Sequence, residues 1–225
     1  LGVELNWTQT CVGLNPLVPR YMWDDPSYGG LVPGAHGAYL GGSGNNGWVP
    51  VTWNPRVQAR IDALLDAFAL AFDDDPDISF LLLEQETTHG ATTEDDPAYT
   101  CDGELQAIKD ILAHAYATFT WTPVFYELDW ACFDIPASLH DFLIAGGRGA
   151  WTINAPTCNA ALDTNAFSLY RRAYAEIWGA VFLDGWNDVH GWPCYESAAD
   201  IFAEIGPVFR PRYFLVDQSN GPYQT

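Results

Sequence analysis

Six short apolar runs, rich in β-branched and aromatic residues, recur along the chain near residues 5, 82, 126, 151, 182 and 214. Segments with helical spacing separate most of them. Near-continuous apolar strands that alternate with helices are typical of a parallel sheet covered by helices on its outside. The sequence therefore predicts the α/β class.

The first helix has the clearest boundary signal, because Asn54-Pro55 is a capping residue followed by proline at the first turn. Its apolar residues share one face: Val57, Ile61, Leu64, Leu65 and Phe68. Further helices are expected at residues 103–119, 136–145, 166–177 and 197–205. Strands are expected at residues 3–7, 78–84, 123–129, 150–153, 179–184 and 212–217. The Gly- and Pro-rich residues 8–55 are interpreted as a long loop that leads into the first helix.

The order of elements favours a (β/α)8 barrel, since no phosphate-binding glycine fingerprint of the doubly wound type follows any strand. Such a barrel has eight strands. If the last run is the eighth strand, residues 1–225 represent a single barrel domain from about the third strand to the eighth. Six strands cannot close a barrel without exposed edges, so two N-terminal strands and the closing C-terminal helix are expected outside this sequence.

The charge of the chain disfavours some classes of binding partner. It has 29 Asp and Glu against 9 Lys and Arg, a formal net charge of -20. Phosphate backbones and anionic lipid would repel such a chain, so nucleic acid and membrane surfaces are disfavoured. No run approaches the roughly 20 apolar residues of a membrane span. With 10 Trp and 11 Tyr, neutral carbohydrate is the favoured partner.

The cysteines favour secretion over metal binding. Without close CxxC spacing they do not predict a zinc site, and no cofactor is expected. In a secreted protein they would form up to two disulfides and leave one thiol, and the pairing stays open. A glycosylation triplet at Asn6 also agrees with an extracellular location. The five cysteines are Cys11, Cys101, Cys132, Cys158 and Cys194.

Every major predicted strand ends with an acidic residue. These residues are Glu84 and Glu86, Glu127 and Asp129, Asp184 and Asp188, and Asp217. In barrels of this kind the reactive groups lie at the carboxyl ends of the strands. Because side chains alternate along a strand, the first two pairs each share a face. Paired carboxylates cleave glycosidic bonds, one as a protonated acid and the other as a nucleophile or base.

Glu86 and Asp184 are the predicted catalytic pair, and Glu84, Glu127 and Asp129 are predicted to position the substrate. The loops after the strands add rings that stack on sugars and polar groups that bind hydroxyls. These are Trp130, Trp186, Asn187, Asp188, His190 and Trp192. Structural alternatives stay open: a solvated or capping acid at Glu86, a turn-forming aspartate at Asp184 and a loop histidine at His190.

The segments WNPRVQARIDALLDAFALAFDDDPDISFLLLEQET and TPVFYELDW resemble the glycoside-hydrolase-like (β/α)8 proteins related to the clan A retaining enzymes. The resemblance is one of pattern and covers roughly residues 48 to 217. It implies an acid/base Glu at the end of the fourth strand, preceded by an amide residue, which Gln85-Glu86 matches. It also implies a nucleophilic Glu at the end of the seventh strand, where this chain has Asp184, one methylene shorter.

The leading hypothesis is a secreted glycoside hydrolase that acts on a polysaccharide or oligosaccharide, with retention favoured. Retaining enzymes hold their two carboxyl groups about 5–5.5 Å apart and inverting enzymes about 6.5–9.5 Å. The alternative is a non-catalytic barrel that binds glycans or forms part of an extracellular assembly, including a homo-oligomer, because a fold does not establish a chemistry.

Overall fold

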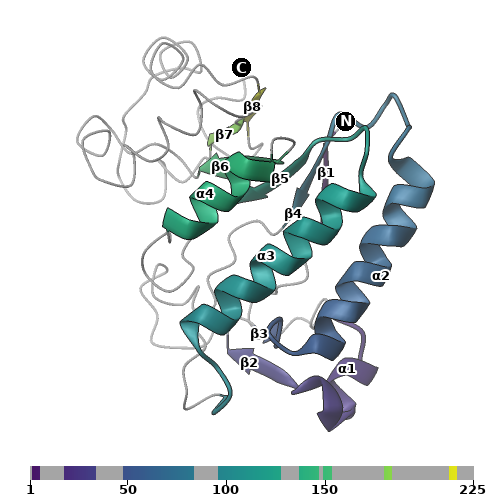
Figure 1. The fold of residues 1–225 in the computed structure, drawn as a ribbon. Helices are drawn as coiled ribbons and strands as arrows, with labels where there is room; N and C mark the ends of the chain where they lie inside the picture. The colour runs from purple at the N-terminus through teal and green to yellow at the C-terminus, as the bar shows by residue number, and fades with distance from the viewer. Residues whose placement is uncertain are drawn as a thin grey trace, which may run out of the picture. The chain divides into compact units, whose positions relative to one another are not determined.

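The computed structural model describes residues 2–5, 18–33, 48–83, 96–127, 137–146, 149–153, 180–183 and 213–216. They belong to two compact units, Leu1–Leu139 and His140–Thr225. All six predicted strands are present, with ends that differ from the predicted ones by at most two residues. The α-helices and β-strands are labelled in Figure 1.

The first unit contains a parallel sheet of three strands, β1 (Gly2–Leu5), β4 (Phe80–Leu83) and β5 (Val124–Glu127). Their order is β1-β4-β5, so the most apolar strand lies between the other two. The register pairs Leu5 with Leu83 and Leu83 with Tyr126. All three strands therefore end at the same edge of the sheet.

Strand β4 is buried along its last three residues, which are at most 2% exposed: Leu81, Leu82 and Leu83. This burial on both faces explains why the run lacks the apolar–polar alternation of a half-exposed strand. Phe80 stacks on Phe125 of β5, with ring centroids 5.1 Å apart. Its register partner in β1 is Gly2, where a Cβ would overlap the Phe80 ring. Glycine at this position makes room for the aromatic pair.

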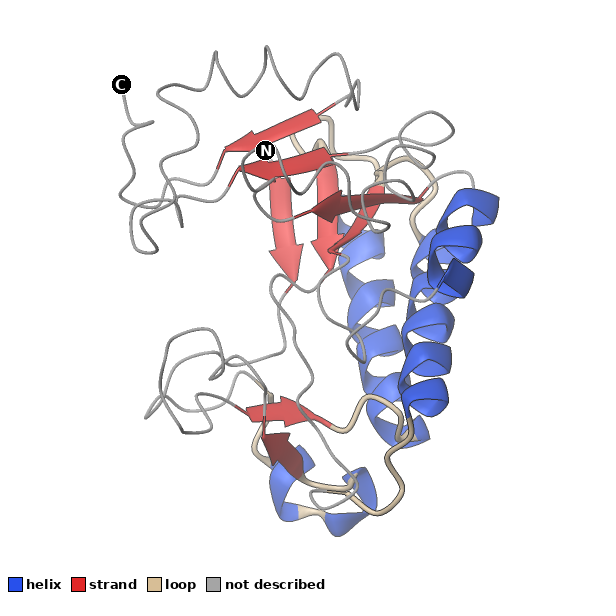
Figure 2. Ribbon diagram, turned by 90° about the vertical axis from the view of Figure 1, so that its left-hand side faces the viewer, coloured by secondary structure: helices blue, strands red, loops and turns tan. Residues whose placement is uncertain are grey.

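Two helices of equal length pack against each other and lie along one face of this sheet (Figure 2). They are α2 (Pro55–Phe72) and α3 (Cys101–Thr118). Val57, Ile61 and Leu65 of α2 are buried as the sequence pattern predicts, but Leu64 is 42% exposed. In α3 the buried face includes one residue that an apolar pattern does not predict, the fully buried Glu104.

Both helices begin at side-chain caps; the cap at Asn54 was predicted, whereas the cap at Thr100 was not, and α3 starts two residues before its predicted start. The Asn54 side chain accepts a hydrogen bond from the Arg56 N–H at 2.9 Å and donates to the Ser27 carbonyl at 3.1 Å. Thr100 accepts from the Gly103 N–H at 3.0 Å. Each cap satisfies a backbone donor that the first helical turn leaves without an intrahelical partner.

Asn54→Ala should lower the free energy of unfolding by about 1–2 kcal/mol, since it removes both the cap and the bond to Ser27. Asn54→Asp is the matched variant, because it keeps the capping oxygen and removes the amide donor, while its negative charge is favoured at the amino end of the helix. We expect it to lose about half as much. Urea unfolding followed by circular dichroism measures both values, and equal losses would show that the cap contributes nothing.

The carboxyl ends of α2 and α3 are joined beside the start of β5. Asp73, at the end of α2, accepts hydrogen bonds from the backbone N–H groups of Thr120, Trp121 and Thr122 at 2.7 to 3.0 Å. An 18-residue helix is roughly 27 Å long and a four-residue strand roughly 13 Å. The amino-terminal turns of both helices consequently extend past the carboxyl ends of the strands (Figure 2).

The segment interpreted as a loop contains regular structure in the parts of it that the structure describes, residues 18–33 and 48–55. The structure places there α1 (Tyr21–Asp24), the 3₁₀ turn η1 (Pro26–Tyr28) and the antiparallel strands β2 (Leu31–Pro33) and β3 (Trp48–Pro50). These elements were not predicted, because they are short and stand among the Gly and Pro residues that led to the loop interpretation. Ser27 binds both Asn54 and Arg56, so this part of the chain packs at the amino end of α2.

The second unit contains a parallel sheet of β6 (Gly149–Ile153), β7 (Ala180–Leu183) and β8 (Tyr213–Val216), in that order. Helix α4 (Ala137–Gly146) precedes it in the chain and matches the helix predicted at 136–145. The helices predicted at 166–177 and 197–205 lie outside the described residues. Each unit thus shows parallel β-structure, and closure into an eight-stranded barrel remains a prediction.

Candidate functional site

The carboxyl edge of the first sheet is the place where two acidic segments leave the strands. Strand β4 ends at Leu83, directly before Glu84, and β5 ends on Glu127 itself. Leu83 and Tyr126 are register partners. Glu84 and Glu127 are therefore the residues that immediately follow one register pair. Glu86 and Asp129 each lie two residues further along the chain, after Glu84 and Glu127.

The sheet of the second unit shows the same pattern. Leu183 of β7 pairs with Val216 of β8, and both are the last residues of their strands. Asp184 and Asp217 directly follow them in the sequence. In each unit, neighbouring parallel strands thus end together and lead into acidic residues.

Of the predicted site residues, the structure describes the backbone of Glu127 alone. The other predicted residues lie outside the described residues. They are Glu84, Glu86, Asp129, Trp130, Asp184, Trp186, Asn187, Asp188, His190 and Trp192.

A polar and aromatic network joins the amino ends of α2 and α3, the end of these helices that extends past the carboxyl ends of the strands. We call it the Trp53 network; its members are Trp53, Asp96, Tyr99 and Glu104. The Trp53 indole N–H donates to Asp96 Oδ2 at 2.7 Å. The rings of Trp53 and Tyr99 meet edge to face, with centroids 4.9 Å apart. The Tyr99 hydroxyl donates to Glu104 Oε2, also at 2.7 Å.

The Trp53 network is partly withdrawn from water. Glu104 is fully buried, and Trp53 and Tyr99 are half-buried against Val51. Burial, the hydrogen bond to Glu104 and the negative charge of that carboxylate raise the pKa of Tyr99 above its ordinary value. The hydroxyl stays protonated and acts as a donor throughout the range in which proteins are folded.

The Trp53 network was not predictable from the sequence, for a specific reason. Its longest link joins Trp53 to Asp96 across 43 residues. No local hydrophobic period or sequence motif predicts a contact between such distant residues. The one sequence signal is Glu104, an acid within the otherwise apolar face of α3. An acid at a buried helix position indicates a partner, although it does not identify that partner.

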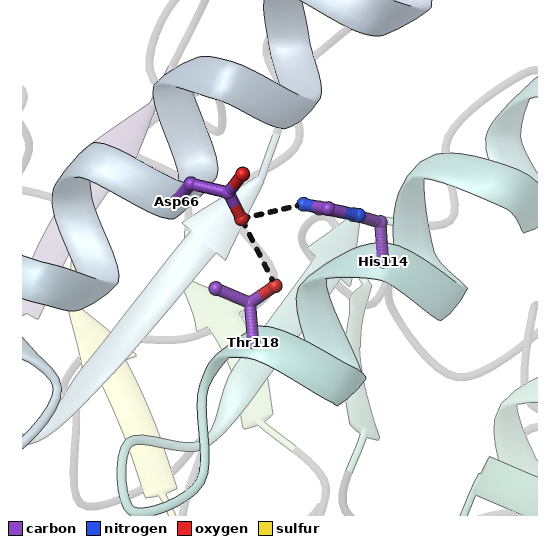
Figure 3. Close-up of polar contacts among 3 residues, drawn as sticks. All are labelled: Asp66, His114 and Thr118. Carbon is purple, nitrogen blue, oxygen red and sulfur yellow. Dashed lines mark hydrogen bonds and ion pairs between the residues drawn. The ribbon is translucent and has the colours of Figure 1, made fainter.

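A second polar cluster ties the middle of α2 to α3 (Figure 3). Asp66 Oδ1 lies 2.8 Å from His114 Nε2 and accepts a longer bond of 3.4 Å from the Thr118 hydroxyl. Burial raises the pKa of nearby Asp62, and the charges of Asp66 and Asp110 add to this effect while His114 opposes it. In the part of the chain that the structure describes, no group of three or more His, Cys, Asp and Glu residues is arranged to hold a metal ion.

Comparison with protein-family models, with curated proteins and with solved structures finds no match to this chain. Family membership therefore stays a prediction that rests on the segments quoted above. Among the helices that the structure describes, none has both the length and the apolar composition needed to cross a membrane.

Proposed function

We propose that this protein is a secreted glycoside hydrolase that cleaves O-glycosidic bonds in a polysaccharide or oligosaccharide. Glu86 acts as the general acid/base, and Asp184 acts as the nucleophile or base. The substrate is positioned by Glu84, Glu127 and Asp129, and by the loop residues Trp130, Trp186, Asn187, Asp188, His190 and Trp192. Retention of the anomeric configuration is the favoured outcome.

The parallel pairing of β4 with β5 is the observation that carries the proposal. Leu83 and Tyr126 are register partners near the ends of these strands. One segment contains Glu84 and Glu86, and the other contains Glu127 and Asp129. Both segments therefore start from the same edge of the sheet. Loops at the carboxyl ends of parallel strands carry the active sites of α/β enzymes. Two carboxyl groups within reach of one bond are the requirement of glycoside hydrolysis.

The charge of the chain supports a neutral glycan as substrate. A net charge of -20 repels polyanions, so sulfated or uronic-acid polymers, nucleic acids and anionic membranes are disfavoured. The reaction as proposed needs no metal and no organic cofactor, because the two carboxyl groups supply both proton transfer and nucleophile.

A screen of the purified protein on a panel of neutral polysaccharides and aryl glycosides tests the proposal. We expect release of reducing sugar from at least one substrate, with the first product in the same anomeric configuration as the substrate by NMR. Binding to a glycan without any cleavage would favour the non-catalytic alternative, in which the same barrel serves as a glycan-binding or structural component. If the protein neither cleaves nor binds any glycan of the panel, both readings are refuted.

A further inference from the structure

Helix α2 carries a row of exposed residues that share one side of the helix. They are Arg60, Leu64, Ala67 and Ala71, separated in turn by four, three and four residues. We call these four residues the α2 stripe. Leu64 is 42% exposed, and the other three are exposed as well. The α2 stripe is thus an accessible and largely apolar surface of the first unit.

The α2 stripe faces away from α3. Asp66 bonds to His114, so it marks the side of α2 that is turned toward α3 (Figure 3). At about 100° per residue, the four stripe residues lie roughly 100–160° around the helix axis from Asp66. Phe68 and Phe72, whose ring centroids are 5.4 Å apart, border the stripe, and Phe72 is 40% exposed. Apolar surfaces of this kind, beside charged residues, mark sites of protein contact.

The charges of α2 are placed against its own helix dipole. Arg56 lies in the first turn and residues 73–75, all aspartate, follow the last, while the first turn has no acid and the last no base. A helix dipole favours the reverse arrangement. A second helix that runs in the opposite direction would compensate both ends. Arg56 donates to Ser27 Oγ at 2.9 Å, and a guanidinium has five N–H donors, so it can bind a carboxylate as well.

A second α2 stripe fits the first in the antiparallel direction. Such a pairing is two-fold symmetric and closes as a dimer. Consider the register in which Leu64 of each copy lies opposite Ala67 of the other. Arg56 lies eight residues before Leu64 and Asp75 eight residues after Ala67, so the same register brings Arg56 of one copy opposite Asp75 of the second copy. The small alanine side chains allow the two helix axes to approach closely.

We propose that the α2 stripe is a dimerisation surface, on which a second copy of this chain packs its own α2 in the antiparallel direction. With 29 acidic and only 9 basic residues, two copies repel each other over most of their surfaces, and Arg56 and Arg60 make α2 a favourable place for contact. A helix roughly 27 Å long gives an interface near the lower limit of specific contacts, so dissociation in the micromolar range is expected. The dimer does not depend on the proposed function.

Sedimentation equilibrium at protein concentrations from about 1 to 100 µM tests the proposal. Ala67→Gln enlarges a residue at the centre of the stripe, and Ala59→Gln makes the same change at an exposed position of α2 outside it. Arg56→Gln and Asp75→Asn each remove one charge, and both are also combined in one chain. Asn at position 75 keeps the oxygen that accepts from the Asp77 N–H. Circular dichroism confirms that each variant is folded.

We expect the native protein to dimerise, and Ala67→Gln to weaken the dimer at least about tenfold, the effect of overpacking a close contact. Ala59→Gln should leave it unchanged. Arg56→Gln and Asp75→Asn should each weaken it about threefold, and the double variant no more than either one, because they remove the same ion pair.

Three results would overturn the proposal. The first is a protein that stays monomeric at all these concentrations, which would leave the α2 stripe to a different partner. The second is a dimer that Ala67→Gln leaves as tight as the native one, because the contact would then lie elsewhere. The third is a tighter dimer in Asp75→Asn, which is what a general loss of negative charge would produce without the pairing to Arg56.

Discussion

Glu86→Gln should reduce hydrolysis by about 10²–10⁴-fold, the usual contribution of a positioned acid/base. Glutamine has nearly the same shape and keeps the hydrogen-bonding oxygen, but it carries no proton to give to the leaving group. The fall is therefore expected in kcat, with little change in substrate binding. Initial rates on the best substrate of the screen, at several concentrations and over a range of pH, give both parameters.

Glu84→Gln is the matched control, since it makes the same chemical change two residues closer to β4. We expect a smaller effect there, mainly on KM, because Glu84 is assigned to substrate positioning. Asp184→Asn should reduce kcat as strongly as Glu86→Gln does. Hydrolysis that is unaffected by Glu86→Gln would remove this residue from the mechanism.

Asp73→Ala should lower the free energy of unfolding by about 2–4 kcal/mol at pH 7, because hydrogen bonds to a charged group are the stronger ones and several are lost together. The Asp73 carboxylate accepts from three backbone N–H groups and from the Thr120 hydroxyl at 2.8 Å. Its removal leaves the N–H of Thr122, which is 6% exposed, without this acceptor. Urea unfolding measured by tryptophan fluorescence gives the value.

The Asp73 contribution should disappear in acid. Burial by itself would raise the pKa of Asp73, but the backbone N–H groups of Thr122, Thr120 and Trp121 outweigh it and hold this pKa below its ordinary value. A group with a lowered folded-state pKa stabilises the fold above its ordinary pKa and loses this effect as the pH falls through the folded value. The difference between the native protein and Asp73→Ala should thus shrink below about pH 4.

Asp74→Ala provides the control, because this neighbouring side chain is exposed. A change within about 0.5 kcal/mol is expected for it, as for most surface substitutions. If Asp73→Ala lowered the free energy of unfolding no more than Asp74→Ala does, the Asp73 carboxylate would not hold the start of β5.

At each end of the α2–α3 pair, an aspartate accepts hydrogen bonds from a distant part of the chain. Asp73 binds residues 120–122 beside the amino end of β5, and Asp96 binds Trp53 at the opposite end. The first tie sets how the helix pair meets the sheet. The second lies on the side of the carboxyl ends of β1, β4 and β5.

The sequence by itself determined the strands, the two long helices and the starting residue of α2, while α3 begins two residues before its predicted start. Apolar runs, helical period and capping residues act over a few neighbouring positions, so they can be read without knowing the fold. The strand ends that lead into Glu84, Glu127, Asp184 and Asp217 were predicted for the same reason.

Only the tertiary structure decided which distant residues meet. Three interactions join positions that are far apart in the sequence. They are the pairing of β2 with β3, the hydrogen bond from Trp53 to Asp96, and the hydrogen bonds from residues 120–122 to Asp73. Likewise, Leu64 is exposed and Glu104 is buried because neighbouring elements, rather than the helical period, decide how much of each helix face is covered. Local physics specifies the elements, and long-range contacts specify their surroundings.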